Sequence, residues 1–145
     1  MRFETDRRYE LPLTPTELWA VLAHVDRYQS WWPWLRRFEA RALADHEVWA
    51  CLVQPPLPYS VGFDLHLDEV RAPTRVRASV TGDVVGEAVL DIAEHPGGSA
   101  ARLRSSLEPG NGFLRTVARL AAPVVRYGHD WVLDTGARGF IDRAT

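Results

Sequence analysis

An alternation of apolar and polar residues, repeated in segment after segment, constrains the fold of this chain most strongly. In the first segment Phe3, Tyr9 and Leu11 alternate with charged residues. Because successive side chains of a strand point to opposite faces, a period of two predicts a strand with one buried and one wet face. Proline- and glycine-containing turns separate the segments, which predicts an antiparallel meander. Further strands are expected near residues 37–42, 48–53, 61–68, 75–80, 87–92 and 101–107.

Two short helices are expected between the first and second strands. Thr14-Pro15-Thr16-Glu17 offers a capping residue, an early proline and an acidic first turn, so Thr14 or Thr16 caps a helix that carries Leu18 and Trp19. A second helix is expected over Val25–Trp32 and ends at Pro33.

The last thirty or so residues predict one long amphipathic helix that Asn111 caps. Pro123 lacks an N–H group, so we expect it to kink this helix. At 100° per residue one narrow sector holds the apolar side chains that we expect to face the sheet, namely Phe113, Val117, Leu120, Val124 and Trp131. The polar side then holds Arg115, Arg119, Arg126 and the His129-Asp130 pair.

Composition excludes several classes of protein. The 145 residues are most simply one domain, 1–145, and a net charge of −2 argues against a nucleic-acid-binding protein. The chain has no lysine, which excludes Schiff-base chemistry on lysine, and Cys51 is its single cysteine, which excludes a disulfide within the chain. There is no signal-peptide core and no run of about 18 apolar residues, so we expect a cytoplasmic protein without an integral membrane segment.

The expected order of strand, two short helices, six strands and one long helix resembles the helix-grip fold of the SRPBCC, or START-like, superfamily. This superfamily includes polyketide cyclases, lipid-transfer domains and pollen-allergen-like proteins. The local segments that are similar to members of the superfamily are Leu13–Trp19, Asp26–Trp34, Pro56–Tyr59, Gly82–Gly86 and Ala122–Asp130. The resemblance implies an α+β fold in which a curved antiparallel sheet of about seven strands wraps around the C-terminal helix. It also implies a cavity for a small hydrophobic or aromatic molecule, lipid-like or polyketide-like.

Few polar residues occupy strand positions whose side chains point to the same face as the alternating apolar residues. They are Thr5, Arg7, Tyr9, Arg36 and Ser105, with Tyr59 at a strand entrance, and no Asp, Glu or His is among them. Arg36 either meets an acidic group of a ligand or extends to the rim. A cavity without a carboxylate or imidazole suits binding better than proton transfer. The candidate ligand-binding residues are Trp34, Arg36, Phe38, Tyr59, Phe63, Leu103, Ser105, Phe113, Val117, Leu120 and Val124.

Other polar motifs are interpreted as solvated or structural. Asp64, His66 and Asp68 share the strand face opposite the apolar set, so we expect them to face solvent, and no metal site or cofactor is predicted. The cluster of Trp31, Trp32 and Trp34 either lines a cavity mouth or fills the core.

Three functions follow as hypotheses. The first is binding of a small apolar or aromatic molecule in a cavity of ~300–1,000 Å³ between sheet and helix. The second is a polyketide cyclase or aromatase with Arg36, Tyr59 and Ser105 orienting carbonyl groups, which a carboxylate or histidine inside the cavity would favour. The third is a protein-interaction module, which a large exposed apolar patch would favour. The sequence leaves open whether the protein forms a homodimer.

Overall fold

Seven antiparallel strands form one curled sheet in the computed structural model. The structure describes residues 2–144, and at residues 122, 124, 143 and 144 it describes the backbone alone. The sheet order is β1-β7-β6-β5-β4-β3-β2. The strands are β1 (Phe3–Leu11), β2 (Leu35–Glu39), β3 (Val48–Val53), β4 (Val61–Arg71), β5 (Arg75–Gly82), β6 (Val84–His95) and β7 (Gly98–Pro109). The predicted α+β architecture and meander are confirmed, because every strand from β2 to β7 pairs with its neighbour in sequence.

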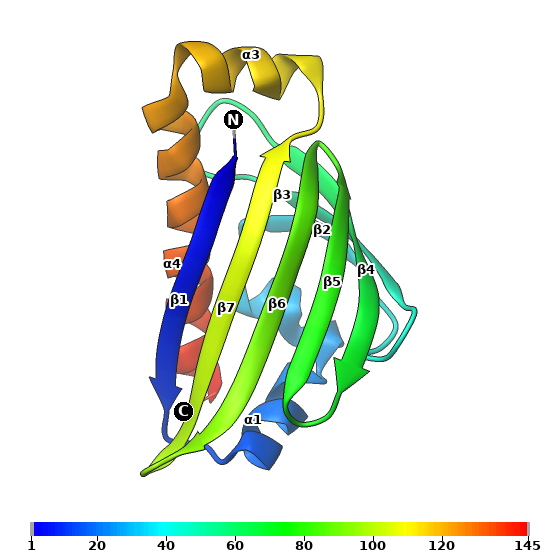
Figure 1. The fold of residues 1–145 in the computed structure, drawn as a ribbon, viewed down its shortest axis with the longest axis vertical. Coiled ribbons are helices and arrows are strands. Elements are labelled where there is room, and N and C mark those ends of the chain that lie inside the picture. Colours follow the sequence, from blue (N-terminus) through cyan, green and yellow to red (C-terminus); the bar gives the residue numbers. More distant parts are fainter. Residues whose placement is uncertain (1, 145) are drawn as a thin grey trace.

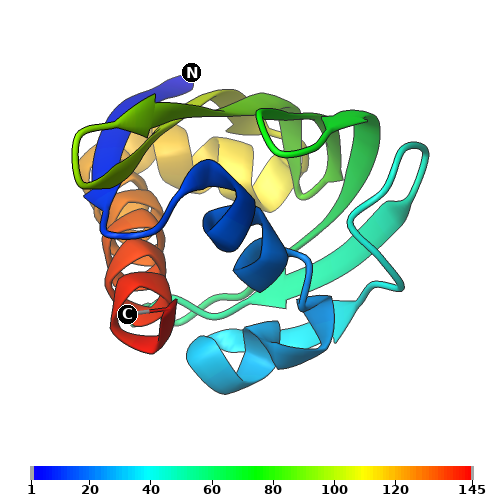
Figure 2. The same cartoon turned by 90° about the horizontal axis from the view of Figure 1, so that it is seen from below.

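The helices pack inside the curve and at the ends of the sheet. Figure 2 shows α1 in the concavity and α4 along one side, with α3 behind them. The helical elements are α1 (Pro15–Leu22), a 3-10 turn η1 (Val25–Arg27), α2 (Tyr28–Trp31), α3 (Gly112–Leu120) and α4 (Ala122–Ala144). Among the described residues no helix is long and apolar enough to cross a membrane.

The predicted start of α1 is confirmed, with Thr14 as the capping residue. The Thr14 hydroxyl accepts a hydrogen bond from the Glu17 backbone N–H at 3.2 Å, and the Glu17 carboxylate accepts one from the Thr14 N–H at 2.9 Å. This reciprocal pair satisfies two donors that a helix N-terminus otherwise leaves open. The hydrogen bond from the Thr14 backbone lowers the pKa of Glu17.

The long C-terminal helix is present as α4, but the prediction that it runs unbroken from Asn111 was wrong. The chain breaks at Ala121, whose φ of −141° and ψ of 50° are not helical, and α3 and α4 are separate helices. In Figure 1, α3 crosses the top of the sheet and α4 descends beside β1. Pro123 lies in the first turn of α4, where its missing N–H would have no helical partner, so it marks a helix start and not a kink.

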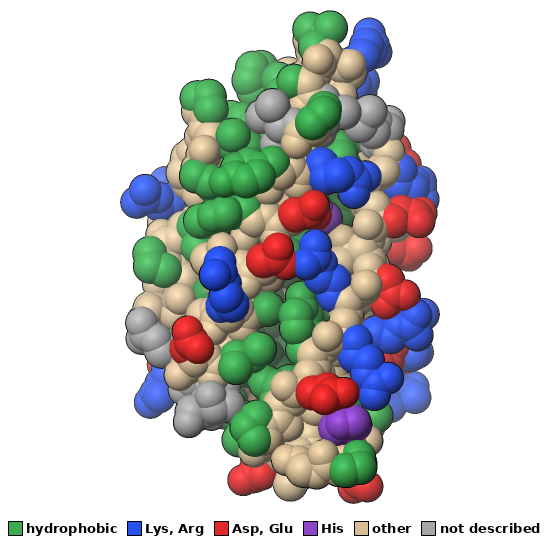
Figure 3. Space-filling model, turned by 90° about the vertical axis from the view of Figure 1, so that its left-hand side faces the viewer, with side chains coloured by type: hydrophobic (Ala, Val, Ile, Leu, Met, Phe, Trp, Pro, Cys, Tyr) green, Lys and Arg blue, Asp and Glu red, His purple; other side chains and the backbone are tan. Residues whose placement is uncertain are grey.

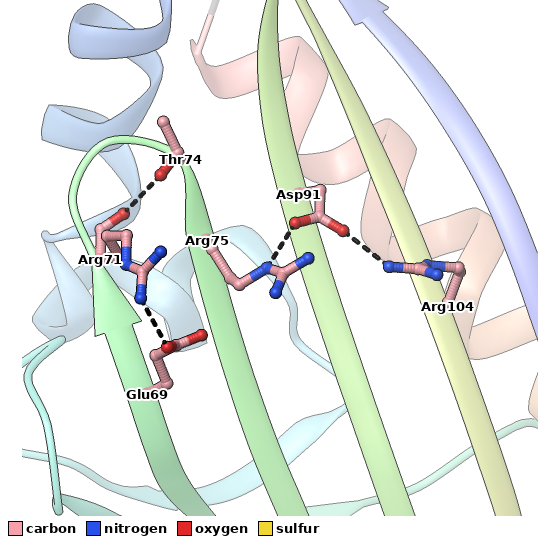
Figure 4. Close-up of polar contacts among 6 residues, drawn as sticks. All are labelled: Glu69, Arg71, Thr74, Arg75, Asp91 and Arg104. Carbon is pink, nitrogen blue, oxygen red and sulfur yellow. Dashed lines mark hydrogen bonds and ion pairs between the residues drawn. The ribbon is translucent and has the colours of Figure 1, made fainter.

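The outer face of the sheet carries the charges that the alternation predicts. Figure 4 shows Asp91 of β6 between Arg75 of β5 and Arg104 of β7, at 2.7 and 2.8 Å. The hydrogen bond from Arg75, together with that from Arg104, holds the pKa of Asp91 below its ordinary value of 3.8. Charged pairs across neighbouring strands therefore cover this face, while the inner face is mainly apolar.

An aromatic cluster around Tyr28 forms the core below the sheet. The Tyr28 ring stacks on Phe38 and on Trp31, with centroids 5.3 Å apart in both cases, and meets the edge of Trp49 at 5.7 Å. Its hydroxyl donates to the Leu22 carbonyl at 2.5 Å, and burial raises its pKa. The cluster therefore joins α1, α2 and the β2–β3 end of the sheet.

Candidate ligand-binding site

Two cavities lie between the inner face of the sheet and α4. The first, called the upper cavity, has a volume of about 240 Å³ and is lined by apolar side chains that include Phe3, Phe63, Leu114 and Val132. The second, the lower cavity, has a volume of about 250 Å³ and lies nearer α1 and α2. Each volume is below the ~300 Å³ that we expected for a ligand site.

The two cavities adjoin each other inside the molecule. Leu103 of β7 and Val132 and Leu133 of α4 line both of them. The space that the sequence predicts is therefore present between sheet and helix but divided by these three side chains.

His129 of α4 is the main polar group of the upper cavity. Its side chain is only 15% exposed, its ring stacks on Phe3 with centroids 6.0 Å apart, and its Nε2 lies 3.5 Å from the Thr5 Oγ1. Its Nδ1 lies 3.2 Å from the Asp130 Oδ1. We expected His129 on the solvated side of the helix and no histidine in the cavity, and both expectations were wrong.

The face of α4 that meets the sheet explains this error. Apolar residues occur on more than one side of the helix, so a helical projection alone does not select the buried side. Gly128, Gly136 and Gly139 lie against the segment before β4 and against the tryptophans at and after the end of α2, all of which are outside the strands. A Cβ atom on Gly128 would lie 2.7 Å from the Leu57 Cδ1, and one on Gly139 would lie 3.0 Å from the Trp31 carbonyl oxygen. The glycines therefore mark where α4 approaches these segments closely, while His129, Val132 and Leu133 face the cavities.

Arg7 connects β1 to α4. It faces the inner side of the sheet, as its strand phase predicts, and forms ion pairs with Asp134 and, at 3.6 Å, with Asp130. Asp130 therefore stands between Arg7 and His129. Because the guanidinium is held by two carboxylates of α4, it links strand and helix.

Four of the predicted site residues line the upper cavity, namely Tyr59, Phe63, Leu103 and Ser105. Trp34 lines the lower cavity, together with Leu103. Burial raises the pKa of Tyr59, which keeps its hydroxyl protonated and able to donate.

The other predicted site residues lie elsewhere. Phe38 packs in the aromatic cluster around Tyr28 and lines neither cavity. Arg36 is exposed, because a register shift between Leu35 and Arg37 moves Leu35 to the buried side. The buried residues of α3 are Leu114 and Ala118. Phe113, Val117 and Leu120 line neither cavity, so the expectation that they face the sheet was wrong. The side chain of Val124 lies outside the described residues.

The lower cavity contains two polar atoms without a partner. The Tyr9 hydroxyl and the Trp34 Nε1 are buried, and neither has a hydrogen-bond partner within the described part of the chain. Trp34 also stacks on Trp32, with centroids 5.7 Å apart, and Trp32 donates its Nε1–H to the Gly136 carbonyl at 2.8 Å. The tryptophans therefore both fill the core and line a cavity, which combines the two alternatives that the sequence left open.

Comparison with known proteins identifies the fold. No protein-family model matches the chain, and no curated protein matches it in sequence. A solved structure of an uncharacterized protein from Rhizobium leguminosarum has a TM-score of 0.71 at 13% identity, covering 99% of this chain and 96% of its own.

Two further solved structures are similar over nearly the whole chain. Ara h 8.0201 has a TM-score of 0.67 at 8% identity and covers 99% of this chain and 98% of its own. Norcoclaurine synthase from Thalictrum flavum, in complex with dopamine and hydroxybenzaldehyde, has a TM-score of 0.67 at 10% identity, covering 98% of this chain and 86% of its own. With a seven-stranded sheet curled around α4, this chain has the helix-grip fold.

Proposed function

We propose that this protein binds a small apolar or aromatic molecule in the upper cavity. One observation carries the proposal: an apolar space between sheet and α4 contains a few polar side chains, those of Tyr59, Ser105 and His129. An apolar wall with a small number of placed polar groups is the usual form of a small-molecule site. The solved complex of norcoclaurine synthase with dopamine and hydroxybenzaldehyde adds support, since two small aromatic molecules bind a protein of this fold there.

The polar groups favour a ligand that carries one hydroxyl or carbonyl group. The separation of 3.5 Å between the His129 Nε2 and the Thr5 Oγ1 is at the long limit for a hydrogen bond, so Nε2 can exchange this contact for a better one. A ligand without a polar group would leave the imidazole unsatisfied in an apolar cavity. The chemical class is therefore a small phenol, alcohol or ketone with an apolar body.

Filling the cavity tests this proposal. Ala88 of β6 lines the upper cavity, and Ala88→Leu would place three more carbon atoms in it. With 2-naphthol as the probe, followed by its own fluorescence, we expect affinity to fall about tenfold or more, since 1.4 kcal/mol of lost contact is a factor of ten. Ala93→Leu is the matched control, because Ala93 is an exposed residue of the same strand. Equal binding by both variants and the unchanged protein would contradict the proposal.

The role of His129 is tested by a pair of probes. His129→Gln is expected to weaken binding of 2-naphthol by roughly 3- to 10-fold, the effect of one hydrogen bond, and to leave naphthalene binding unchanged. Isothermal titration with both probes measures the difference. An equal loss for the two probes would mean that His129 contributes shape and no polar contact.

A second candidate function is proton transfer on the bound molecule, as in a cyclase or related enzyme. The contact between the His129 Nδ1 and the Asp130 carboxylate favours it, because a carboxylate orients an imidazole so that the other nitrogen faces the substrate. Arg36 is exposed, so it cannot orient a carbonyl group of a substrate in the cavity, as the cyclase hypothesis required. Turnover that His129→Gln abolishes while 2-naphthol still binds would distinguish the enzyme from the binding protein.

A further inference from the structure

The outward side of α3 is an apolar surface without a partner in the described chain. Phe113 is 62% exposed and Leu120 is 80% exposed, and they lie about 20° apart around the helix, with Val117 beside them. The other side of the same helix is buried through Leu114 and Ala118. Since Leu114 already holds α3 against the upper cavity, the fold does not require the exposed apolar residues.

Within residues 111–129 the charged side chains have one sign, while the Asp83 carboxylate accepts a hydrogen bond from the side chain of Asn111, the cap of α3, at 2.9 Å. Residues 111–129 include Arg115, Arg119 and Arg126 but no Asp or Glu, although the whole chain has a net charge of −2. Arg75, Arg102 and Arg104 on the sheet each pair with an aspartate, whereas no ion pair of Arg115 or Arg119 occurs within the described residues. Figure 3 shows hydrophobic side chains and arginines together in the upper part of the molecule, over α3 and the start of α4. This end is therefore both apolar and basic.

We propose that α3 docks this protein on an anionic lipid bilayer. A bilayer interface accepts apolar side chains at the acyl boundary and attracts arginine to its phosphate groups, so it matches both properties of the surface. Tyr127, which is 55% exposed on the first turns of α4, adds an aromatic side chain with a polar tip, the type enriched at such interfaces. The proposal rests on the surface of α3 and does not depend on a ligand in the cavity.

Two other occupants fit the surface less well. A second copy of the chain, placed by a two-fold axis, would bring Arg115 and Arg119 near their own equivalents, and like charges repel across an interface. A nucleic acid would use the arginines but would gain nothing from a largely exposed leucine. Only the bilayer uses both kinds of side chain.

Sedimentation with lipid vesicles tests the proposal. We expect the unchanged protein to sediment with phosphatidylcholine vesicles that contain about one third phosphatidylglycerol and to stay in solution with pure phosphatidylcholine. Arg115→Glu with Arg119→Glu is expected to reduce binding by roughly tenfold or more, as is high salt, which screens the arginines. Phe113→Ser with Leu120→Ser is expected to reduce it similarly.

The matched control is Val48→Ser, because Val48 is 50% exposed on β3 and lies outside α3 and α4. We expect this variant to bind like the unchanged protein, with circular dichroism confirming that all variants are folded. Failure of the unchanged protein to sediment with anionic vesicles would overturn the proposal. So would equal binding by the arginine variant, or a concentration-dependent dimer that Leu120→Ser abolishes.

Discussion

Gly128 sets the distance between α4 and the segment before β4. A Cβ at this position would lie 2.7 Å from the Leu57 Cδ1 and 3.2 Å from the Tyr59 hydroxyl oxygen. A real Cβ does not approach another atom as closely as 2.7 Å, so a side chain here would force the ends of the Leu57 and Tyr59 side chains to shift. Because Tyr59 and Gly128 both line the upper cavity, this one position affects packing and the candidate site together.

Gly128→Ala is therefore expected to destabilise the protein by about 1 kcal/mol, the low end of the range for overpacking, because the atoms that it meets are the ends of side chains that can shift. Gly112→Ala is the matched control, because Gly112 is also a helical glycine and has no atom within 4 Å of a built Cβ. Alanine is the better helix former, so this control should be neutral or stabilise by up to ~1 kcal/mol. Urea unfolding measures both, and equal midpoints for the two variants would contradict the prediction.

At the scale of the elements, charged side chains support the pairing of β5, β6 and β7. Asp91 accepts hydrogen bonds from Arg75 and Arg104 on the strands at either side (Figure 4). All three side chains are partly exposed, so water and salt weaken the interaction. Their contribution is thus modest, but it depends on pH in a defined direction.

Asp91→Asn is expected to lower the free energy of unfolding by about 0.5–1 kcal/mol near neutral pH. The pKa of Asp91 is lower in the folded than in the unfolded state, so the unfolded state binds the proton first as pH falls. The stabilisation is therefore complete above the ordinary value of 3.8 and is lost as pH falls through the lower folded pKa. Denaturant unfolding of both proteins from neutral pH to below pH 3.8 checks this, and a difference that grows in acid would contradict it.

The sequence predicted the strands far better than the last two helices. Strands have a period of two with one wet face, so a residue such as Phe63 or Leu103 can be placed inward from the pattern alone. The capping box at Thr14 is also a local signal. In α4 apolar residues occur on several sides, so the pattern does not select the buried one, and in α3 the apolar side is wider than the part that the core buries through Leu114 and Ala118. His129 and Arg36 were misplaced for such reasons, the second through a local bulge in β2.

At the scale of the whole molecule, the thiol of Cys51 reports on global unfolding. Cys51 lies buried in β3, and burial raises its pKa to about 12. Thiol reagents attack the thiolate, so reaction in the folded state is suppressed both by access and by protonation.

We expect the reaction of Cys51 with a thiol reagent to follow the denaturation curve measured by circular dichroism, with little labelling before the transition. The single cysteine makes the assignment unambiguous. Fast labelling of the folded protein would contradict the prediction, because it would show that this end of the sheet opens locally.

The pairing of β1 with β7 has a consequence for how the molecule is made. Phe3 pairs with Leu107, so the first strand meets a partner about a hundred residues later in the chain. Closing so large a loop lowers the entropy of the chain before the stabilising contacts between the strands form, and a high contact order slows folding. During synthesis β1 cannot pair with β7 until β7 has been made, and α4 follows β7 in the chain. Until α4 is made, the part of the inner face that it covers stays exposed, and exposed apolar surface of this kind favours aggregation of a partly folded chain.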